Sequence, residues 1–507
     1  MDYLAFLLAD HMRTDLLLTN HDARRSAGDH RAGNSQAHRP HRKRGLIVWL
    51  VTGQKLKLEA KSVRHEKCGV GSERFVTRAA CFCNTFVTCT VCSYWQRYGL
   101  PARSTNAIRN FTEKDFSSLA LLGRFRAVLA GVLDKGEVVT HRSFADSKRR
   151  LAIGDYLSLF LLGLFNPVAR TLRGIVQASG LPEVRQKAGV PKVSLGSFSD
   201  AQDVVDPALL ELVFASLAEQ LPETGELAPA LRLERWLARD SSLFAALPRM
   251  AWALYGGGRD GFLNNAVRLH VSFDLLKDAP ASVQITPGKK CERATLRAEI
   301  EIKPGGAYVG DRYFGEDYGF FGHLSARGCP YLIRLLDRGA EPAVEEEIAL
   351  SATDAQNGVL RQAWVRLGSA RSRSERLRFI WVRGDNGEIL HLATNRRPEE
   401  LSAADAALLY KKRWQVEYFF RWVKCLLGCG HWLAESPRGV AIQLYLALIG
   451  AMLLQLDLGR RPSKRVWELL QWHLVGMLDD ATLAQELSRQ LTAEERQRAQ
   501  KKQRAAK

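Results

Sequence analysis

The first sustained pattern of apolar residues begins near residue 111 and has the period of a helix. Its apolar side chains recur three to four positions apart, and residues at that spacing share one face of a helix. They are Phe116, Leu119, Leu122, Phe125, Val128 and Val132. Similar patterns predict helices over 153–165, 171–179 and 207–221, with breaks at Gly180, Pro182 and 194–199. Residues 171–189 are compatible with a helix-turn-helix around Gly180, a pattern that ordinary helix pairs share.

After Leu233 the period changes to that of strands. Residues 267–275 alternate strictly between apolar and polar side chains, which predicts a half-buried strand, and Val283 and Ile285 begin another. The pattern also predicts strands over 307–310, 331–336, 377–383 and 388–394, and a helix over 316–327 that Gly328 closes. The last two strands flank the sequence Gly-Asp-Asn-Gly, which is a hairpin signal.

Long helical patterns return at the end of the chain, over 403–427, 440–456 and 464–478, before a basic tail from Thr492. The segment 440–456 is the longest apolar one, but Gln443 and Gln455 interrupt it. A membrane-spanning helix needs about 20 predominantly apolar residues, so we expect a buried core helix there and no membrane partner. Acidic residues near the N-terminus, where a signal peptide has basic ones, predict a cytoplasmic protein.

Composition adds a strong positive charge to this picture. The chain has 507 residues, of which 46% are hydrophobic and 9% aromatic, and its net charge is +19. This length suggests roughly three domains, and the apolar content excludes disorder throughout. The charge favours a polyanionic partner, with nucleic acid first and an anionic membrane surface second.

The first 105 residues differ from the rest of the chain. They show no sustained period, and they hold five of the nine cysteines and six of the twelve histidines. Cys89 and Cys92 form a C-x-x-C pair that, with Cys81 and Cys83, is one possible zinc site. The close spacing of Cys81 and Cys83 is unfavourable for two ligands, so we expect a poorly ordered or spurious extension instead.

Candidate chemistry is concentrated in the segment 403–427. Tyr410, Arg413, Glu417 and Lys424 occupy offsets 0, 3, 7 and 14, which on one continuous helix fall within an arc of about 60°. Apolar residues lie opposite, namely Val416, Phe419, Val423 and Leu426. A solvated helix face with an ordinary Arg413–Glu417 pair is the simpler interpretation.

The spacing Y-x2-R-x3-E-x6-K closely resembles the signature of bacterial transposases of the insertion sequence 4 family. Three further stretches agree: 195–202 (LGSFSDAQ) resembles a helical region of the family, 239–244 (RDSSLF) its first acidic strand and 309–314 (VGDRYF) its second. Thr394 and Asn395, before the signature, also fit. The resemblance covers roughly residues 111–471.

This resemblance implies an α/β fold: a ribonuclease H-like catalytic domain with a β-rich insertion, flanked by helical N-terminal and C-terminal regions. It also implies a catalytic, metal-binding triad of Asp240, Asp311 and Glu417. The chemistry independently favours such a triad, because two Mg²⁺ ions about 3.5 to 4 Å apart can stabilise both oxygens of an in-line phosphoryl transfer. Small hard cations prefer carboxylate ligands, and Mn²⁺ is expected as a substitute for Mg²⁺.

The same resemblance assigns DNA phosphate binding to Tyr410, Arg413 and Lys424, with Arg421 as a further candidate. In related transposases an aromatic residue of the insertion stacks on a flipped base. Trp364 and Trp381 are therefore candidates, although a core tryptophan in a strand is the commoner case.

Each triad member also has a local alternative. Asp240 is followed by two serines and could cap a turn, whereas Arg413 alone could satisfy Glu417. Glu316 or Asp317 could replace Asp311, although both suit the first turn of the following helix.

Other sites have weaker support in the sequence. His270 and His323 lack partners at metal-ligand spacing, so we expect structural roles for both. The sequence contains neither a glycine-rich phosphate loop nor a Ser-His nucleophile pattern, which argues against ATP hydrolysis and acyl transfer.

The resulting hypothesis is a DDE-type DNA transposase that cuts and joins the ends of its own insertion sequence. Its partners would be double-stranded DNA at terminal inverted repeats and target DNA, in a complex containing a homodimer. We expect an extension over 1–105, a helical DNA-binding region over 106–230, the two parts of the catalytic core over 231–340 and 401–430, the insertion over 341–400 and a helical C-terminal region over 431–507. The alternatives are a catalytically inactive copy that represses at element ends and a zinc-dependent nucleic-acid binder.

Overall fold

The computed structural model describes residues 120–505, apart from 225–226, 228, 258–262, 303–304, 337–341, 370–371 and 427–430. All of these residues belong to one compact unit, 87–507. The predictions for residues 1–105, including the zinc hypothesis at Cys81, Cys83, Cys89 and Cys92, lie outside the described residues. So does the start of the first predicted helix.

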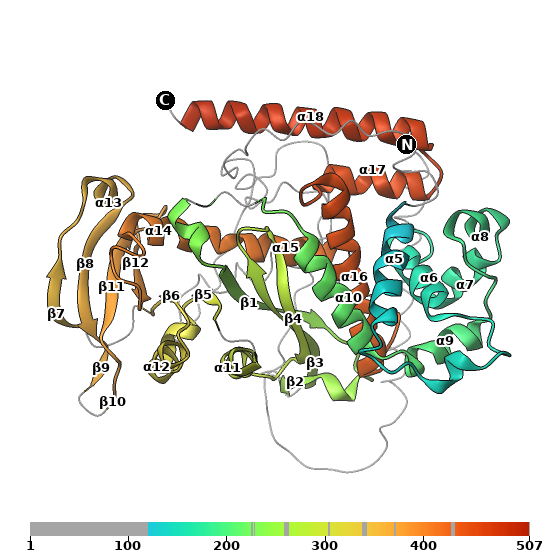
Figure 1. Ribbon diagram of the computed structural model, residues 1–507, viewed down its shortest axis with the longest axis horizontal. Coiled ribbons are helices and arrows are strands. Elements are labelled where there is room, and N and C mark those ends of the chain that lie inside the picture. The colour runs from blue at the N-terminus through green and yellow to red at the C-terminus, as the bar shows by residue number, and fades with distance from the viewer. Residues whose placement is uncertain are drawn as a thin grey trace, which may run out of the picture. The chain divides into compact units, whose positions relative to one another are not determined.

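Helices build the first part of the described chain (Figure 1). They are α5 (Ala120–Asp134), α6 (Ile153–Phe165), α7 (Leu172–Ser179), α8 (Pro182–Ala188), α9 (Leu195–Val204) and α10 (Pro207–Gln220). The predicted break at Gly180 and Pro182 is confirmed, because α7 ends at Ser179 and α8 begins at Pro182. The predicted break at 194–199 was wrong, because α9 begins at Leu195. Pro182 starts α8, because a proline in the first turn loses no helical hydrogen bond, and the Ser194 side chain caps α9 by accepting from the Ser197 amide.

A mixed sheet forms the centre of the fold. Its first strands are β1 (Trp236–Ala245), β2 (Leu254–Gly257), β3 (Leu263–Asp274), β4 (Ala279–Pro287), β5 (Ala307–Gly310) and β6 (Tyr331–Arg334). β3 runs antiparallel to β1 and to β4, whereas β5 runs parallel to both β1 and β6. The strand order through this part is β4-β3-β1-β5-β6. The carboxyl ends of β1, β5 and β6 therefore point in the same direction.

The segment 341–400 is rich in strands, as predicted, and it extends the central sheet. Its strands are β7 (Ala343–Ile348), β8 (Val359–Arg366), β9 (Gly368–Ser369), β10 (Ser372–Arg373), β11 (Leu377–Arg383) and β12 (Ile389–Thr394). The order continues as β6-β12-β11-β8-β7, because β12 pairs with β6. β11 and β12 form the predicted hairpin, in which Gly387 has a φ of 84° that a side chain would disfavour.

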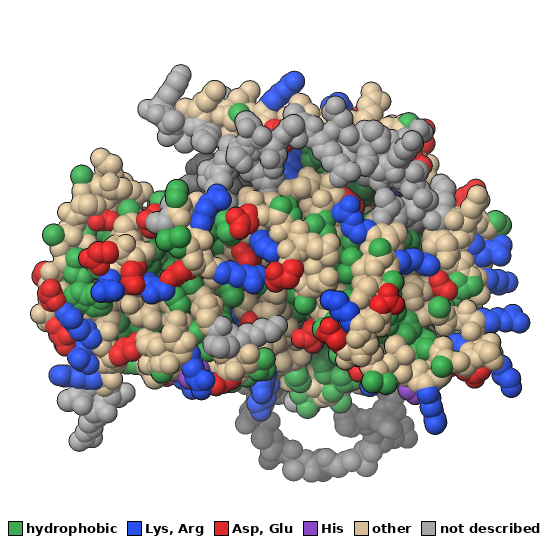
Figure 2. All heavy atoms as spheres, viewed as in Figure 1, with side chains coloured by type: hydrophobic (Ala, Val, Ile, Leu, Met, Phe, Trp, Pro, Cys, Tyr) green, Lys and Arg blue, Asp and Glu red, His purple; other side chains and the backbone are tan. Residues whose placement is uncertain are grey.

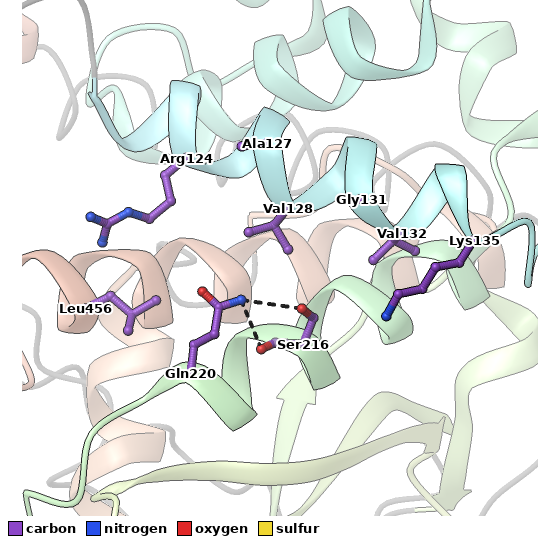
Figure 3. A pocket seen from close by; sticks show the side chains of 9 residues that line it. All are labelled: Arg124, Ala127, Val128, Gly131, Val132, Lys135, Ser216, Gln220 and Leu456. Atoms are coloured by element: carbon purple, nitrogen blue, oxygen red, sulfur yellow. Dashed lines mark hydrogen bonds between the residues drawn. The ribbon is translucent and has the colours of Figure 1, made fainter.

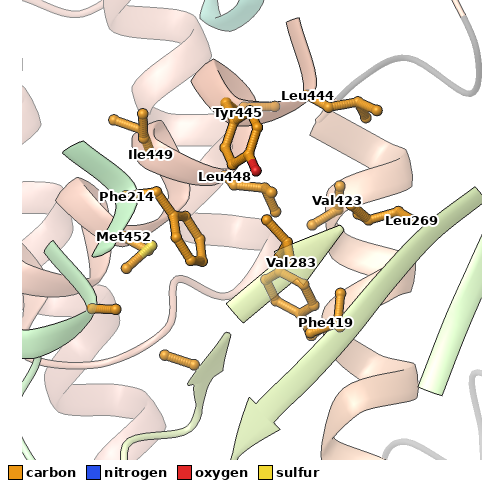
Figure 4. Close-up of a cluster of buried hydrophobic side chains, with 14 of the residues drawn as sticks. Phe214, Leu269, Val283, Phe419, Val423, Leu444, Tyr445, Leu448, Ile449 and Met452 are labelled. Carbon is orange, nitrogen blue, oxygen red and sulfur yellow. The ribbon is translucent and has the colours of Figure 1, made fainter. Parts of the chain in front are cut away.

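Both faces of the central sheet are covered. On one face, α11 (Glu292–Ile302) and α12 (Tyr318–Ala326) bury Leu237, Tyr308 and Ile333. On the other, β1, β3 and β5 contribute to the core that contains α10, α15 (Trp414–Leu426) and α16 (Pro437–Leu458). Figure 4 shows Leu269 and Val283 from the sheet beside Phe419 and Val423. The strand at 267–275 is thus buried on both sides, not half-buried as predicted, because α11 covers its polar residues.

The apolar segment at 440–456 lies within α16, as expected for a core helix. Among the described residues, α16 is the one helix long and apolar enough to cross a membrane. Its most apolar window is 89% buried inside the protein, mainly by α10, with α5, α6 and α9 also packed against it. This burial explains its composition without a membrane.

The insertion also fixes the start of the helix that leads to the candidate site. α13 (Ala352–Gln356) contains Asp354, whose carboxylate accepts a hydrogen bond from the Ala404 amide at 2.8 Å. Ala404 lies in the first turn of α14 (Ala403–Lys412), where amides lack partners within the helix. Asn395 links β12 to the start of β6 by accepting from the Tyr331 amide.

Two helices end the chain, α17 (Lys464–Leu474) and α18 (Asp480–Ala505). They share a small apolar cluster that includes Val466, Leu469, Leu483 and Leu487. The segment from Thr492 was expected to be a tail, but it continues α18 as a helix. The sequence from Thr492 has no apolar period that would predict a helix. It is rich in residues with high helix propensity, and only this composition indicated the helix.

Candidate active site

β1 and β5 place two of the predicted carboxylates side by side. Ala238 pairs with Val309 and Arg239 with Gly310, so the next positions along the two strands are Asp240 and Asp311. Ala238 and Val309 both point into the core on the α15 side of the sheet. Because side chains alternate along a strand, Asp240 and Asp311 point to that side too.

Arg413 connects this pair to the signature glutamate. Its guanidinium donates to Asp240 Oδ2 at 3.4 Å and to Glu417 Oε1 at 2.7 Å, and its side chain is only 8% exposed. Burial lowers the pKa of Arg413, but the nearby Tyr410, Glu417 and Asp240 outweigh that effect and raise it. The arginine is therefore a permanent cation between two carboxylates.

The electrostatics of Asp240 show that all three carboxylates are close. Its pKa is raised to about 7, mainly by burial; Arg413 lowers the pKa, whereas repulsion from Asp311 and Glu417 contributes to the rise. The structure thus places Asp240 inside β1, Asp311 directly after β5 and Glu417 on α15, within electrostatic reach of one another. In this arrangement Asp240 does not act as a turn cap, because it lies inside β1.

The alternative acids lie elsewhere in the structure. Asp317 is the N-cap residue of α12 and pairs with Arg297 at 2.9 Å, whereas Glu316 lies 3.5 Å from Arg293. Both arginines belong to α11, on the opposite face of the sheet from α15. These contacts separate Glu316 and Asp317 from the cluster of carboxylates.

The single helix predicted over 403–427 is wrong. The structure has two helices, α14 and α15, which meet at Arg413. The amide of Arg413 donates to Tyr410 O and that of Val416 to Arg413 O, so the chain is wound more tightly there than in an α-helix. The predicted apolar face is confirmed at Val416, Phe419 and Val423, which are buried.

The remaining signature residues differ in their surroundings. Tyr410 is buried at the end of α14, and Lys424 Nζ lies 5.6 Å from the ring centre of Phe244 on β1. Arg421 is exposed and stacks over Tyr418 instead of facing the carboxylates. Tyr410 and Arg413 are thus beside the carboxylates, and Lys424 lies farther along β1.

The comparisons with known proteins agree with this geometry. Residues 234–453 match the family model described as "Transposase DDE domain". This part of the chain is thus similar to DDE-type transposases of insertion sequences. The matched region includes β1, β5 and α15, and so all three carboxylates of the cluster.

The curated relatives of this chain have modest sequence identity to it. A putative transposase, y4zB, of Sinorhizobium fredii is 28% identical over 38% of this chain and 53% of its own length. The probable transposase for insertion sequence element IS5377 of Geobacillus stearothermophilus is 25% identical over 62% of this chain and 78% of its own length. The match thus spans about half the length of the first relative.

A third relative, the putative transposase for element IS4SA of Synechocystis, is 24% identical over 52% of this chain and 72% of its own length. Among solved structures, the piggyBac transposase synaptic complex with hairpin DNA aligns with 76% of this chain and 80% of its own, at 10% identity and a TM-score of 0.34. A TM-score this low does not establish a shared fold.

The donor chemistry of the cluster suits a divalent metal ion. Three carboxylates with mutual repulsion supply the hard oxygen ligands that Mg²⁺ prefers. The pKa of Asp240 is raised mainly by burial and further by Asp311 and Glu417, although Arg413 lowers it. Among the described residues, no group of three acidic, histidine or cysteine side chains is close enough as arranged to hold an ion. Arg413 instead supplies the positive charge between Asp240 and Glu417.

The two candidate tryptophans of the insertion point to opposite faces of the sheet. Trp364 of β8 lies opposite Arg378 of β11, and Trp381 of β11 lies opposite Arg361 of β8. Paired residues share a face, and positions 378 and 381 are three residues apart on one strand, so their side chains point to opposite faces. Trp381 packs on the α12 side. Trp364 is on the carboxylate side, but four strands from β5, so neither contacts the cluster.

Charged residues around these tryptophans are already paired. Figure 2 shows acidic and basic side chains mixed at the edge of the insertion. Arg376 lies over Trp364 and pairs with Glu345 and Glu346, and Arg361 lies over Trp381 and pairs with Glu347. Such surface pairs contribute little to stability, but they neutralise the basic charge of this edge.

The two histidines lie away from the carboxylates. His270 is fully buried on the α11 side, where its ring nitrogens contact Thr286 and Thr295. His323 lies 3.7 Å from Glu301. A cavity of about 810 Å³ between α5, α10 and α16 is also separate from the site, since Val128, Val132 and Leu456 line it with Arg124 and Lys135 near its edge (Figure 3).

Sequence reasoning missed the polar residues that support β1 from the other face. Arg239 is fully buried and donates to Glu299 at 2.7 Å and to Ser272 at 2.9 Å. Next to it, Ser241 and Arg268 both donate to Glu292. The alternation of Arg239, Asp240 and Ser241 was visible in the sequence, but their partners come from α11 and β3 and have no local signal.

Proposed function

We propose that this protein is a DNA transposase that cuts and joins the ends of its own insertion sequence by two-metal phosphoryl transfer. The observation that carries the proposal is the convergence of Asp240, Asp311 and Glu417 on one face of the sheet, within electrostatic reach of one another. The similarity of residues 234–453 to the transposase DDE domain supports the same reaction class. The substrates would be double-stranded DNA at terminal inverted repeats and target DNA in the cell's nucleoid.

The arrangement of the sheet supports a ribonuclease H-like catalytic domain. Three antiparallel strands, β4, β3 and β1, are followed in the sheet by β5 and β6, which run parallel to β1. Asp240 lies inside the central strand and Asp311 just beyond the adjacent one. This arrangement is the one expected of that fold, in which the β-rich insertion separates β6 from the signature helix.

In this mechanism the three carboxylates would hold two Mg²⁺ ions, or Mn²⁺ in their place. When bound, such ions stabilise the attacking and leaving oxygens of an in-line displacement. Arg413 orients Asp240 and Glu417 through its two hydrogen bonds. Tyr410, Arg413 and Lys424 would bind DNA phosphates, with Arg421 contacting DNA farther from the carboxylates.

Two further parts of the proposal rest on the nature of the reaction. Two element ends must be held together during transposition, so a homodimer in the DNA complex is expected. The helical region before β1, which the sequence assigned to residues 106–230, would bind element-end DNA, and α7 and α8 around Gly180 are the first candidates. A catalytically inactive copy is less favoured, because the three carboxylates and Arg413 are intact.

The test is metal-dependent cleavage of DNA carrying the element's ends. Changing Asp240, Asp311 or Glu417 singly to Ala should abolish cleavage, by at least about a thousandfold, and leave DNA binding largely intact. Glu316→Ala is the matched control, because Glu316 lies close in sequence to Asp311 but pairs with α11. The assignment is wrong for any triad residue whose variant still cuts at the wild-type rate, and wrong for Asp311 if the Glu316 variant is inactive instead.

A further inference from the structure

Arg334 is a cation of the site that lies outside the signature spacing. It is the last residue of β6, the strand that pairs with β5 on the side away from β1. Tyr331 and Ile333 pack against α12 on one face, whereas Leu332 belongs to the core on the α15 face. Because side chains alternate, Arg334 points to the α15 face, as Asp240 and Asp311 do.

Arg334 has no direct partner among the described side chains. Its Nε is buried without a hydrogen-bond partner, and within the described part of the chain its guanidinium makes neither an ion pair nor a hydrogen bond. Other buried arginines are paired: Arg239 with Glu299, Arg460 with Glu494 and Arg413 with Glu417. Arg334 is only partly exposed to solvent, so water compensates it incompletely.

An arginine in this state weakens the fold unless it has a ligand. Removing a charge from water costs several kcal/mol, and a partner of opposite charge must offset that cost. Arginine is the side chain best suited to phosphate, since its planar fork donates two parallel hydrogen bonds. A residue that is unpaired in the protein alone therefore indicates a binding role.

Tyr410 locates Arg334 relative to the carboxylates. The pKa of the Tyr410 hydroxyl is raised, mainly by burial, with Arg413 and Arg334 lowering it and Asp311 raising it. Both Arg334 and Asp311 are thus within electrostatic reach of one hydroxyl. β6 is two strands away from β1 in the sheet, so the spacing between strands puts the Cα atom of Arg334 about 10 Å from the Cα atom of Asp240. Lys424 lies in another direction, over Phe244 farther along β1.

We propose that Arg334 forms an anion-binding subsite at the β6 edge of the carboxylate cluster, and that its ligand is a phosphodiester of the DNA strand. This inference rests on the proposed function, because it assumes that DNA occupies the site. Arg334 and Lys424 then bind phosphates on two sides of the carboxylates. The backbone of the bound strand would accordingly pass over Asp311 between β6 and β1.

The experiment compares two changes at Arg334 with a matched control. Arg334→Met removes the charge and keeps much of the side chain's length, whereas Arg334→Lys keeps the charge. The control is Arg327→Met, because Arg327 is exposed, pairs with Glu301 and ends α12 on the opposite face. Binding of the full chain to a short DNA duplex is measured without divalent metal at several salt concentrations. The thermal unfolding midpoint is measured without DNA.

Arg334→Met should weaken binding about three- to tenfold at about 0.1 M salt and make the slope of log K against log salt shallower by about one unit. Arg334→Lys should keep the wild-type slope, and so should Arg327→Met. The unfolding midpoint of Arg334→Met should equal or exceed that of the wild type, since an unpaired charge is lost. A lower midpoint would show a structural role and overturn the subsite.

The outcomes separate this inference from the proposed function. If the wild type binds and cuts DNA but Arg334→Met has an unchanged salt slope, the subsite is wrong and the transposase mechanism stands. If the wild type does not bind DNA at any salt concentration, the proposed function fails as well. A slope that is shallower in both Arg334→Met and Arg327→Met would also overturn the subsite, because the effect would then be one of net charge.

Discussion

At the scale of the residue, neighbours on β1 have opposite roles because their side chains point to opposite faces. Asp240 points to the α15 side, where Asp311, Arg413 and Glu417 surround it. Arg239 points to α11, where its terminal nitrogens donate to Glu299, Ser272 and Thr295. Burial lowers the pKa of Arg239, and Glu299 raises it in compensation. These polar contacts on the α11 side of β1 therefore support the strand that carries Asp240.

His270 lies on the same α11 side of the sheet, and its titration is expected to make the free energy of unfolding depend on pH. Its pKa is lowered to about 3, mainly by burial and further by Arg239, Arg268 and Lys290. In the unfolded chain a histidine binds a proton at about pH 6.5. The unfolded state thus holds more protons between those values, so the free energy of unfolding falls as the pH falls through this window.

We therefore expect His270→Gln to reduce this pH dependence. Between pH 6.5 and pH 5 the wild type should lose about 2 kcal/mol through this one group, because each pH unit corresponds to about 1.4 kcal/mol. Urea unfolding at a series of pH values measures it for both proteins. Equal slopes in that window would show that His270 titrates normally in the folded protein.

At the scale of the element, the break between α14 and α15 decides how the signature residues meet the sheet. No glycine or proline occurs between Tyr410 and Glu417, so nothing local requires the helix to end. The backbone of Arg413 stays in the right-handed region, and its guanidinium reaches both Asp240 and Glu417. Arg413 therefore lies at the junction of the two helices, whereas Lys424 lies near the end of α15.

We expect Lys424 and Glu417, two residues of the signature, to have separate roles in DNA binding and in cleavage. Lys424→Ala should weaken DNA binding and make its salt slope shallower by about one unit, as expected for one lost phosphate contact. Glu417→Ala should abolish cleavage and leave the slope unchanged, because a carboxylate makes no phosphate contact. Binding at several salt concentrations without metal, and cleavage with Mg²⁺ at saturating protein, measure the two effects. An unchanged slope in Lys424→Ala would favour an ordinary solvated face at this end of α15.

At the scale of the whole molecule, the insertion and the core form one continuous sheet. β12 pairs with β6 from Thr394 to Leu392, and Asp354 of the insertion holds the start of α14. The segment between β6 and the signature helix is thus part of the support of the site. The packing seen in the described residues begins with α5 and closes through α16.

This closed packing predicts that residues 1–105 are dispensable. A chain that begins at Asn106 should be soluble, unfold cooperatively and cut element-end DNA with Mg²⁺ at about the wild-type rate. Circular dichroism, thermal unfolding and the cleavage assay test this directly. Misfolding of the shortened chain, or stoichiometric zinc in the full chain that is lost in Cys89→Ser and Cys92→Ser variants, would instead identify a genuine domain.

Periodicity and turn chemistry were sufficient for many elements. The predicted bounds of α6, β5 and β11 agree with the structure, because each has one backbone geometry and clear ends. The signature spacing and the resemblance also named Asp240, Asp311 and Glu417, which the structure then brings together. The local pattern of apolar residues was sufficient to predict these elements, because it indicates which face of a helix or strand is buried.

Only the tertiary structure decided the features that depend on residues distant in sequence. Arg413, where α14 ends, contacts Asp240 of β1. Both faces of β3 are buried because α11 covers one of them. The orientation of Arg334 follows from the position of β6 between β5 and β12. A residue's own neighbours along the chain carry no record of such partners. The sequence by itself determined which carboxylates are the candidates for catalysis, whereas packing of the sheet against α14 and α15 decided which cations lie near them.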